Sequence, residues 1–286
     1  MTGASAAALS GRIAALAALP STAPLPTDAR ALVDALLDAL EAGTVRAAER
    51  GDDGVWRAVP WVKQGILLGF RVGRLEDMSP PGAGPLSFVD KDTYPARRFA
   101  ADAGVRIVPG GSAVRRGAYL APGVVCMPPM YVNVGAHVGP GTMIDSHALV
   151  GSCAQVGARV HLSAAAQLGG VLEPVNASPV VVEDEVLIGG GCGVYEGTVV
   201  RTGAVLAAGV VLTRGTPVFD LVRETVYRAD ATRPLEIPAG AVVVPGARAV
   251  AAGWGAAQGL SLQTPVVVKY RDDRTDAATA LERWLR

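Results

Sequence analysis

Aromatic residues and cysteines are scarce in this sequence. Phe, Trp and Tyr make up 5% of its 286 residues, and the only cysteines are Cys126, Cys153 and Cys192. An odd cysteine count argues against a disulfide framework, and the spacing of the three matches no zinc motif. We expect reduced thiols that partly fill a core, and therefore an intracellular, cytoplasmic protein.

An excess of charge and a long apolar run are also missing. The formal net charge is +0 and the sequence pI is about 6.8, so we expect no binding to nucleic acid or to an anionic membrane surface. No apolar run approaches the roughly 20 residues that a membrane span needs. Residues 1–26 lack a basic beginning and Arg12 interrupts their apolar stretch, which favours a short amphipathic helix over a signal peptide.

Aliphatic residues, by contrast, recur at every sixth position between residues 108 and 212. The first run is Val108, Val114, Leu120, Cys126, Val132, Val138, Ile144, Val150, Val156, Leu162 and Leu168, in which only Cys126 is not aliphatic. The second run, in shifted register, is Val182, Ile188, Val194, Val200, Leu206 and Leu212. Neither a helix nor a simple strand has a strict period of six. This period is typical of a hexapeptide β-helix, in which each hexad forms one flat face and one corner.

The finer pattern of the hexads supports a left-handed parallel β-helix of roughly six coils. A second inward position, four residues after the first, carries the small side chains that a narrow interior requires: Ala118, Ala136, Thr142, Ala148, Ala154 and Ala166. The register shifts by two residues within residues 173–179, which predicts a bulge or loop leaving the prism. A larger excursion is predicted over residues 214–236, with the pattern returning at Ile237 and Val243.

The segments on either side complete a mainly β fold with a small N-terminal α/β domain and a C-terminal strand–helix cap. We expect helices over residues 1–48, with a cap near Thr27, and a buried strand over residues 61–72. A strand over residues 264–270 and a terminal helix over residues 276–286 close the chain. The predicted domains are residues 1–104, 105–250 and 251–286.

Four charged residues stand out as candidates for chemistry. Asp145 occupies a corner position beside Ser146 and His147, although an aspartate there also suits a turn. Arg106 and Arg115 can each bind a carboxylate in bidentate fashion, although both also suit a solvated coil end.

Glu196 is the fourth candidate, and it also suits an exposed surface position. Asp145 and Glu196 are eight hexads apart plus the two shifted residues, which is two coils and two faces. They therefore lie on different corners of one prism and can approach each other only across an interface between subunits.

The three histidines, His137, His147 and His161, suggest a different class of protein. A zinc-dependent β-helix hydratase holds its metal with three histidines between subunits, and zinc ligands must converge at about 2.0–2.1 Å. His137 and His161 are four hexads apart and point outward from different faces, which weakens this alternative. An outward His161 as general base for acyl transfer is a further possibility.

Longer blocks of the sequence resemble one family, the tetrahydrodipicolinate N-succinyltransferases. The blocks are GVRIVPG, AVRRGAYLAPGVVCMPPMYVNVGAHVGPGTMID, VGSCAQVGARVHLS and LGGVLEPVNASPVVVEDEVLIG, with WVKQGILLGFRV, IPAGAVVVPG and VVVKYRD outside them. The resemblance runs from about residue 47 to the C-terminal part of the chain. A hexapeptide repeat alone indicates only a β-helix, whereas VGSCAQVG with VHLS and GGVLEP is much more specific.

The resemblance implies a homotrimer with active sites between neighbouring prisms. It implies transfer of succinyl from the co-substrate succinyl-CoA to the amino group of opened, hydrated tetrahydrodipicolinate, in lysine and diaminopimelate biosynthesis, with no permanently bound cofactor and no metal. Matched position by position, Arg106 and Asp145 correspond to substrate-binding residues of the family. Glu196 corresponds to the Glu of its VEG element, which makes Asp145 and Glu196 the catalytic candidates.

The remaining assignments follow from the chemistry that the resemblance implies. Arg115 is a second carboxylate clamp after Arg106, because the acceptor is a dicarboxylate. The pantetheine arm of the co-substrate is amide-rich, and we expect it to lie along corner backbone. The cofactor-binding candidates are Ser163, Gly189, Ala208 and Gly209.

The sequence also departs from the family pattern. Some members carry an acidic residue three positions before the Glu, and here that position is Gly193. The family's Asp-Thr-Trp becomes Asp145-Ser146-His147, and a Gly-rich run becomes residues 164–167. A related N-acetyltransferase acting on a similar amino-dicarboxylate is therefore the alternative function.

Overall fold

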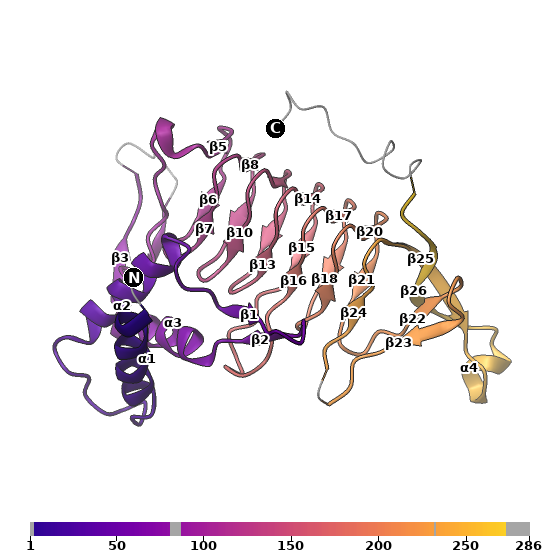
Figure 1. The fold of residues 1–286 in the computed structure, drawn as a ribbon, viewed down its shortest axis with the longest axis horizontal. Helices are drawn as coiled ribbons and strands as arrows, with labels where there is room; N and C mark the ends of the chain where they lie inside the picture. Colours follow the sequence, from indigo (N-terminus) through magenta and orange to yellow (C-terminus); the bar gives the residue numbers. More distant parts are fainter. Residues whose placement is uncertain (1–2, 81–86, 232, 273–286) are drawn as a thin grey trace.

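The computed structural model describes residues 3–80, 87–231 and 233–272, and a parallel β-helix with three faces forms its centre (Figure 1). Each coil contributes one short strand to each of three faces, as the period of six predicts. Face 1 consists of β7 (Tyr119–Leu120), β10 (His137–Val138), β13 (Gln155–Val156), β16 (Val181–Val182), β19 (Val199–Val200) and β24 (Glu236–Ile237). The fold is the predicted left-handed hexapeptide prism.

The other two faces follow in the same coil order. Face 2 consists of β5 (Arg106–Ile107), β8 (Val125–Cys126), β11 (Met143–Ile144), β14 (His161–Leu162), β17 (Leu187–Ile188), β20 (Val205–Leu206) and β25 (Ala241–Ala249). Face 3 consists of β6 (Ala113–Val114), β9 (Tyr131–Val132), β12 (Leu149–Val150), β15 (Gln167–Leu168), β18 (Gly193–Val194) and β21 (Val211–Leu212). Neighbouring strands within each face are parallel and in register.

The inward positions of the hexads are filled by the predicted aliphatic and small side chains. Ile144, Leu162 and Leu206 are fully buried, as are the small Ala154 and Ala166. Thr142 is also fully buried, and its hydroxyl bonds both the Gly157 carbonyl, at 2.8 Å, and the Val160 N–H, at 3.0 Å. Since a buried polar group must be paired to be tolerated, Thr142 fits the apolar interior. The three cysteines are reduced and buried.

A loop leaves the prism where the sequence predicts it, but the loop is longer than predicted. Leu168 ends β15 on face 3 and Val182 ends β16 on face 1, and these consecutive face positions are 14 residues apart. The loop thus adds eight residues, which a sequence count in steps of six registers as only two. Asp145 and Glu196 are consequently separated by two coils and one face, and the predicted two coils and two faces is wrong. They still follow different faces.

The second excursion and the C-terminal part extend face 2. After β21 the chain forms the antiparallel pair β22 (Val218–Asp220) and β23 (Thr225–Tyr227) before the hexad pattern returns at β24 and β25, as predicted. The short helix α4 (Gly253–Ala257) precedes β26 (Ser261–Tyr270), which pairs with β25. The predicted strand over residues 264–270 is confirmed within β26. The predicted helix over residues 276–286 lies outside the described residues.

The N-terminal segment is mixed α and β. It contains α1 (Gly3–Ala17), α2 (Ala29–Glu41), β1 (Ala48–Arg50), β2 (Trp56–Ala58), α3 (Pro60–Val72), β3 (Leu75–Asp77), β4 (Val89–Lys91) and the 3₁₀ turn Ala101–Ala103. The two predicted N-terminal helices are confirmed. The N-cap of α2 is Asp28, which makes no side-chain capping bond, so the predicted cap at Thr27 is one residue early.

The predicted strand over residues 61–72 is wrong, because this segment is helix α3. Its apolar side chains contact both the helices and the prism, so most of its surface is buried. Val62 and Ile66 are fully buried, and Gly65 and Gly69 allow Leu36 and Tyr94 to approach the helix closely. The run from Ile66 to Phe70 is continuously apolar, and such a run fits a buried strand as well as a buried helix.

The N-terminal segment packs against face 1. The Tyr119 ring, on β7, stacks on the His137 ring with centroids 4.5 Å apart, and α2 contacts β7. Further along the face, Arg46 bonds Gln155 and Trp56 bonds Glu183. Figure 1 shows β1 and β2 running beside the prism. Within the described ranges no helix has the length and apolar character of a membrane span.

Candidate active site

Five of the predicted site residues lie along one edge of the prism, the corner between faces 2 and 3. The Asp145 N–H donates to the Leu162 carbonyl at 2.8 Å, the Ser163 N–H to Ile188 at 2.9 Å, and the Gly189 N–H to Leu206 at 2.8 Å. These bonds stack the residues that follow β11, β14, β17 and β20 in consecutive coils. Asp145, Ser163, Gly189 and the pair Ala208–Gly209 therefore share a single edge, which we call the 2/3 corner.

The 2/3 corner presents backbone donors at a regular interval. The N–H groups of Ala164, Gly190 and Ala208, each two residues after a face-2 strand, have no hydrogen-bond partner in the described ranges. By contrast, the N–H groups of Ser163, Gly189 and Gly209 are used between coils. Gly189 also has a packing role, because a Cβ there would lie 2.6 Å from the Ala208 nitrogen. Of the four cofactor candidates, Ala208 thus offers its amide and Ser163 its hydroxyl.

Asp145 is half-buried at the low end of these donors. Its Oδ1 accepts the Ser146 N–H at 2.7 Å, which fixes the carboxylate. His147, two residues on, is exposed and adopts a φ of 61°, the left-handed conformation of this corner. With Oδ1 engaged, the second carboxylate oxygen is the one able to accept a proton or a hydrogen bond from a ligand.

Arg106 lies on the outer side of face 2, two strands from Asp145. β5 pairs with β8 through Arg106 and Val125, and β8 pairs with β11 through Val125 and Met143. Its side chain is exposed at the first coil. Arg106 and Asp145 therefore share the face 2 side of the prism, a placement compatible with joint contact to one ligand.

Arg115 is engaged elsewhere. It forms an ion pair with Asp90 at 2.5 Å, and its guanidinium carbon lies 5.2 Å from the Phe70 ring centroid and 4.9 Å from that of Tyr94. Only 14% of its side chain is exposed. These contacts attach the N-terminal segment to face 3, and substrate binding by Arg115 stays a prediction.

Glu196 lines a separate cleft of about 900 Å³ at the corner between faces 3 and 1. The cleft is formed by the loop after β15 and by residues around Arg214 and Arg233. Glu196 is exposed, has a φ of 52°, and accepts the Arg214 N–H at 2.7 Å through Oε2. One chain therefore keeps Glu196 away from Asp145, as the different corners require.

The departure from the family pattern at Gly193 has a steric explanation. The Tyr195 ring folds back over its own strand, so that a Cβ at Gly193 would lie 2.4 Å from ring atom Cε2. A Cβ at Gly169 would likewise lie 2.7 Å from ring atom Cδ1. Tyr195 therefore occupies the space that a side chain at position 193 would take. Sequence reasoning missed this residue, although the aromatic in a Gly-rich block was a signal.

The histidines lie on different parts of the prism, as predicted. His137 is on face 1 beneath Tyr119, and burial, together with the charge of Arg46, lowers its pKa to about 3. His161 is on face 2 between Met143 and Leu187. Within the part of the chain that the structure describes, no three His, Cys, Asp or Glu side chains gather as a metal site. Because of its low pKa, His137 stays neutral near pH 7, and it lies on the face that packs against the N-terminal segment.

Comparisons with known proteins agree with this architecture. Residues 17–72 match the model "Tetrahydrodipicolinate N-succinyltransferase N-terminal", and residues 179–214 match "Hexapeptide repeat of succinyl-transferase". The 2,3,4,5-tetrahydropyridine-2,6-dicarboxylate N-succinyltransferase of Polynucleobacter asymbioticus is 45% identical, over 91% of this chain and 91% of that protein. The protein of that name from Acinetobacter baylyi is 41% identical, over 93% of each.

A solved structure from Campylobacter jejuni, titled a putative 2,3,4,5-tetrahydropyridine-2-carboxylate N-succinyltransferase, is 19% identical. It covers 85% of this chain and 63% of that one, with a TM-score of 0.46. This likeness is too weak to support an argument, and the sequence relatives carry the assignment.

The three-faced prism and the matched hexapeptide-repeat model together place the chain in the class of hexapeptide-repeat acyltransferases. The full-length relatives narrow the class. The chain belongs to the tetrahydrodipicolinate N-succinyltransferase family.

Proposed function

We propose that this protein transfers the succinyl group of succinyl-CoA to the amino group of opened, hydrated tetrahydrodipicolinate, in lysine and diaminopimelate biosynthesis. The main support is membership of a family whose relatives match over 91% of both chains. The 2/3 corner supports the same conclusion, because it combines a carboxylate with a series of unused N–H donors. No bound cofactor or metal is needed for this reaction, because a thioester is already an activated acyl donor.

Asp145 and Arg106 have complementary roles in this proposal. The acceptor amine must be neutral when it attacks the thioester carbonyl, and the free oxygen of Asp145 orients the amine and takes its proton. Arg106 pairs with a carboxylate of the acceptor, for which a guanidinium fork has the matching geometry. The attack forms the new C–N bond, and the C–S bond then breaks to release the CoA thiol.

The N–H groups along the 2/3 corner bind the acyl donor. Ala208 and the Ser163 hydroxyl bond the amides of the pantetheine arm, with Gly189 and Gly209 holding the neighbouring backbone close to the ligand. Ala164 directly follows Ser163, and Gly190 directly follows Gly189. Their N–H groups stabilise the oxyanion as it forms at the thioester carbonyl. Holding both reactants on a rigid edge itself lowers the activation free energy greatly, because the entropy cost of bringing them together is met on binding and not in the transition state.

The complete site is built between protomers of a homotrimer. Asp145 and Glu196 follow different faces, and the N-terminal segment packs on face 1. Faces 2 and 3 carry partly exposed apolar side chains, such as Leu187 and Val211, that suit side-by-side packing of prisms. In such a trimer the 2/3 corner of one prism faces the Glu196 cleft of its neighbour, so Glu196 assists Asp145 across the interface.

A thiol-release assay tests the reaction. Purified protein is mixed with succinyl-CoA or acetyl-CoA, with tetrahydrodipicolinate or 2-aminopimelate as acceptor, and free CoA thiol is measured. We expect acceptor-dependent release with succinyl-CoA well above that with acetyl-CoA. A preference for acetyl-CoA would instead identify the related N-acetyltransferase, and acceptor-independent release would contradict both functions.

A further inference from the structure

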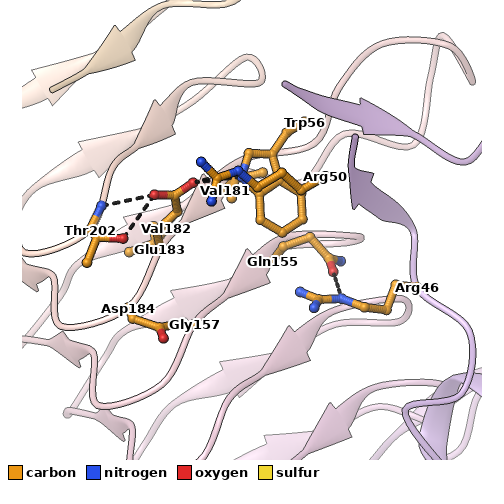
Figure 2. A pocket seen from close by; sticks show the side chains of 10 residues that line it. All are labelled: Arg46, Arg50, Trp56, Gln155, Gly157, Val181, Val182, Glu183, Asp184 and Thr202. Atoms are coloured by element: carbon orange, nitrogen blue, oxygen red, sulfur yellow. Dashed lines mark hydrogen bonds and ion pairs between the residues drawn. The ribbon is translucent and has the colours of Figure 1, made fainter. Parts of the chain in front are cut away.

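A polar cavity of about 180 Å³ lies where the N-terminal segment meets face 1, away from the 2/3 corner and from Glu196 (Figure 2). Its walls combine charged and apolar groups. They include Arg46, Arg50, Trp56, Gln155 and Asp184. The acyl transfer proposed above makes no use of these residues.

Arg46 is held rigidly at one side of this cavity. Its Nε donates to Gln155 Oε1 at 2.9 Å, and the Gln155 amide nitrogen in turn donates to the Cys153 carbonyl at 2.8 Å. The Trp56 ring centroid lies 5.5 Å from the guanidinium carbon. Because Gln155 is buried and fixed by these bonds, the orientation of the guanidinium is set before any ligand arrives.

The two terminal nitrogens of Arg46 have no hydrogen-bond acceptor among residues 3–80, 87–231 and 233–272, and Arg46 is one of the residues that line the cavity. Figure 2 shows them on the far side of the guanidinium from Gln155. Burial lowers the pKa of Arg46, against the opposing effect of Glu49 and Asp184. A guanidinium remains charged under such a shift, so an unpaired cation faces the cavity.

The two carboxylates of the cavity differ in how fully they are bonded. Glu183 accepts hydrogen bonds from Trp56 Nε1 at 2.9 Å, from Arg201 at 2.8 Å, and from the N–H and hydroxyl of Thr202 at 3.1 Å each. Asp184 uses one oxygen, which accepts the Ala158 N–H at 2.8 Å. Its other oxygen has no partner in the described ranges. Glu183 is therefore a structural group, and Asp184 is available to a ligand.

We propose that this cavity binds a small α-amino acid, with the ligand carboxylate on Arg46 and the ligand ammonium on Asp184. A guanidinium presents two parallel N–H groups that match a carboxylate, and Asp184 supplies the opposite charge at the same opening. A cavity of about 150 Å³ can enclose a molecule of benzene's size, roughly six heavy atoms, so glycine or alanine fits this volume. The Trp56 ring and Val181 form the apolar wall for the short side chain.

The test uses the full chain and three probes of similar size. L-Alanine carries both charges, acetate only the negative one and ethylammonium only the positive one. Saturation-transfer NMR titrations near pH 7.5 give the dissociation constants. We expect L-alanine to bind at least about tenfold more tightly than either single-charge probe, because one charge-assisted hydrogen bond contributes that much. Equal binding of acetate and L-alanine, or no saturable binding of L-alanine, would overturn the proposal.

Two variants locate the binding on these residues. Asp184→Asn keeps an oxygen for the Ala158 N–H and removes only the charge, and Arg46→Gln removes the guanidinium. We expect each to weaken L-alanine binding by about tenfold or more. Asp77→Asn is the matched control, since Asp77 accepts the Ser79 N–H at 2.8 Å in the N-terminal segment and lies outside the cavity. Unchanged affinity in a folded Asp184→Asn variant would refute the site. Binding is measured without acyl transfer, so the result is independent of the proposed reaction.

Discussion

Asp145→Asn separates the chemical role of the carboxylate from its structural role. The asparagine side chain has the same shape, and its amide oxygen can still accept the Ser146 N–H that lies 2.7 Å from Oδ1. The second oxygen, free in the native protein, becomes an NH₂ group that cannot take a proton. We therefore expect the free energy of unfolding to change by less than about 0.5 kcal/mol. The turnover number is expected to fall at least about a hundredfold, or about 2.7 kcal/mol in activation free energy.

The assay is steady-state thiol release with succinyl-CoA at saturating acceptor, combined with urea unfolding of both proteins. Asp77→Asn serves as the control, because it makes the same chemical change at a carboxylate that also bonds a backbone N–H. We expect that control to keep full turnover. Near-normal turnover of Asp145→Asn would remove Asp145 from the mechanism. A loss of turnover that only parallels a loss of stability would show a structural role instead.

Three further predictions concern packing, pH and assembly. Gly193→Ala should destabilise the fold by about 1–3 kcal/mol in urea unfolding, because its Cβ overlaps the Tyr195 ring. In a Tyr195→Ala background the same substitution should cost much less, and additive effects would show that the ring is not the cause. Burial raises the pKa of Glu183, but its bonds from Trp56, Arg201 and Thr202 outweigh burial and hold that pKa below 4.5. The stability that Glu183 contributes is thus present above about pH 4.5 and is lost as pH falls through the lower pKa of the folded state. The wild-type protein should therefore lose more stability than Glu183→Gln between about pH 5 and pH 3. Equal losses in the two proteins would contradict this. Finally, sedimentation equilibrium should give the mass of a trimer, and a monomer mass would exclude sites built between protomers.

The period of six predicted the prism because every sixth residue must point into the core, so the pattern of aliphatic residues locates each face. Ile144 and Leu162 are both buried in successive coils of one face, and their spacing of 18 residues follows from three hexads. The sequence could not give the length of the loop after Leu168, because a count in steps of six cannot detect a whole extra hexad. This ambiguity produced the error in the number of faces between Asp145 and Glu196.

Helix α3 escaped sequence reasoning for a different physical reason. Its buried residues include Lys63, whose Nζ bonds the Ala177 carbonyl at 2.5 Å, so one of its two charged residues faces the protein interior. Two local signals were present, namely Pro60 at the first helical turn and a length of 13 residues, which is long for a strand. The pairing of Arg46 with Gln155 joins segments 109 residues apart, and no local pattern could predict it.

The hydrogen bonds between coils along the 2/3 corner set the position of each corner residue along the prism axis, whatever number of residues separates it from the next. Ser163 and Gly189 are 26 residues apart, yet they occupy neighbouring rungs, since the Ser163 N–H bonds the carbonyl just before Gly189. Each rung rises by about 4.8 Å, so the four rungs from Asp145 upward span about 14 Å. The spacing of the corner residues is thus fixed by the coils, and a loop between two coils can lengthen or shorten without changing that spacing. Only the loss or gain of a whole coil would change the length of extended ligand that the corner can bind.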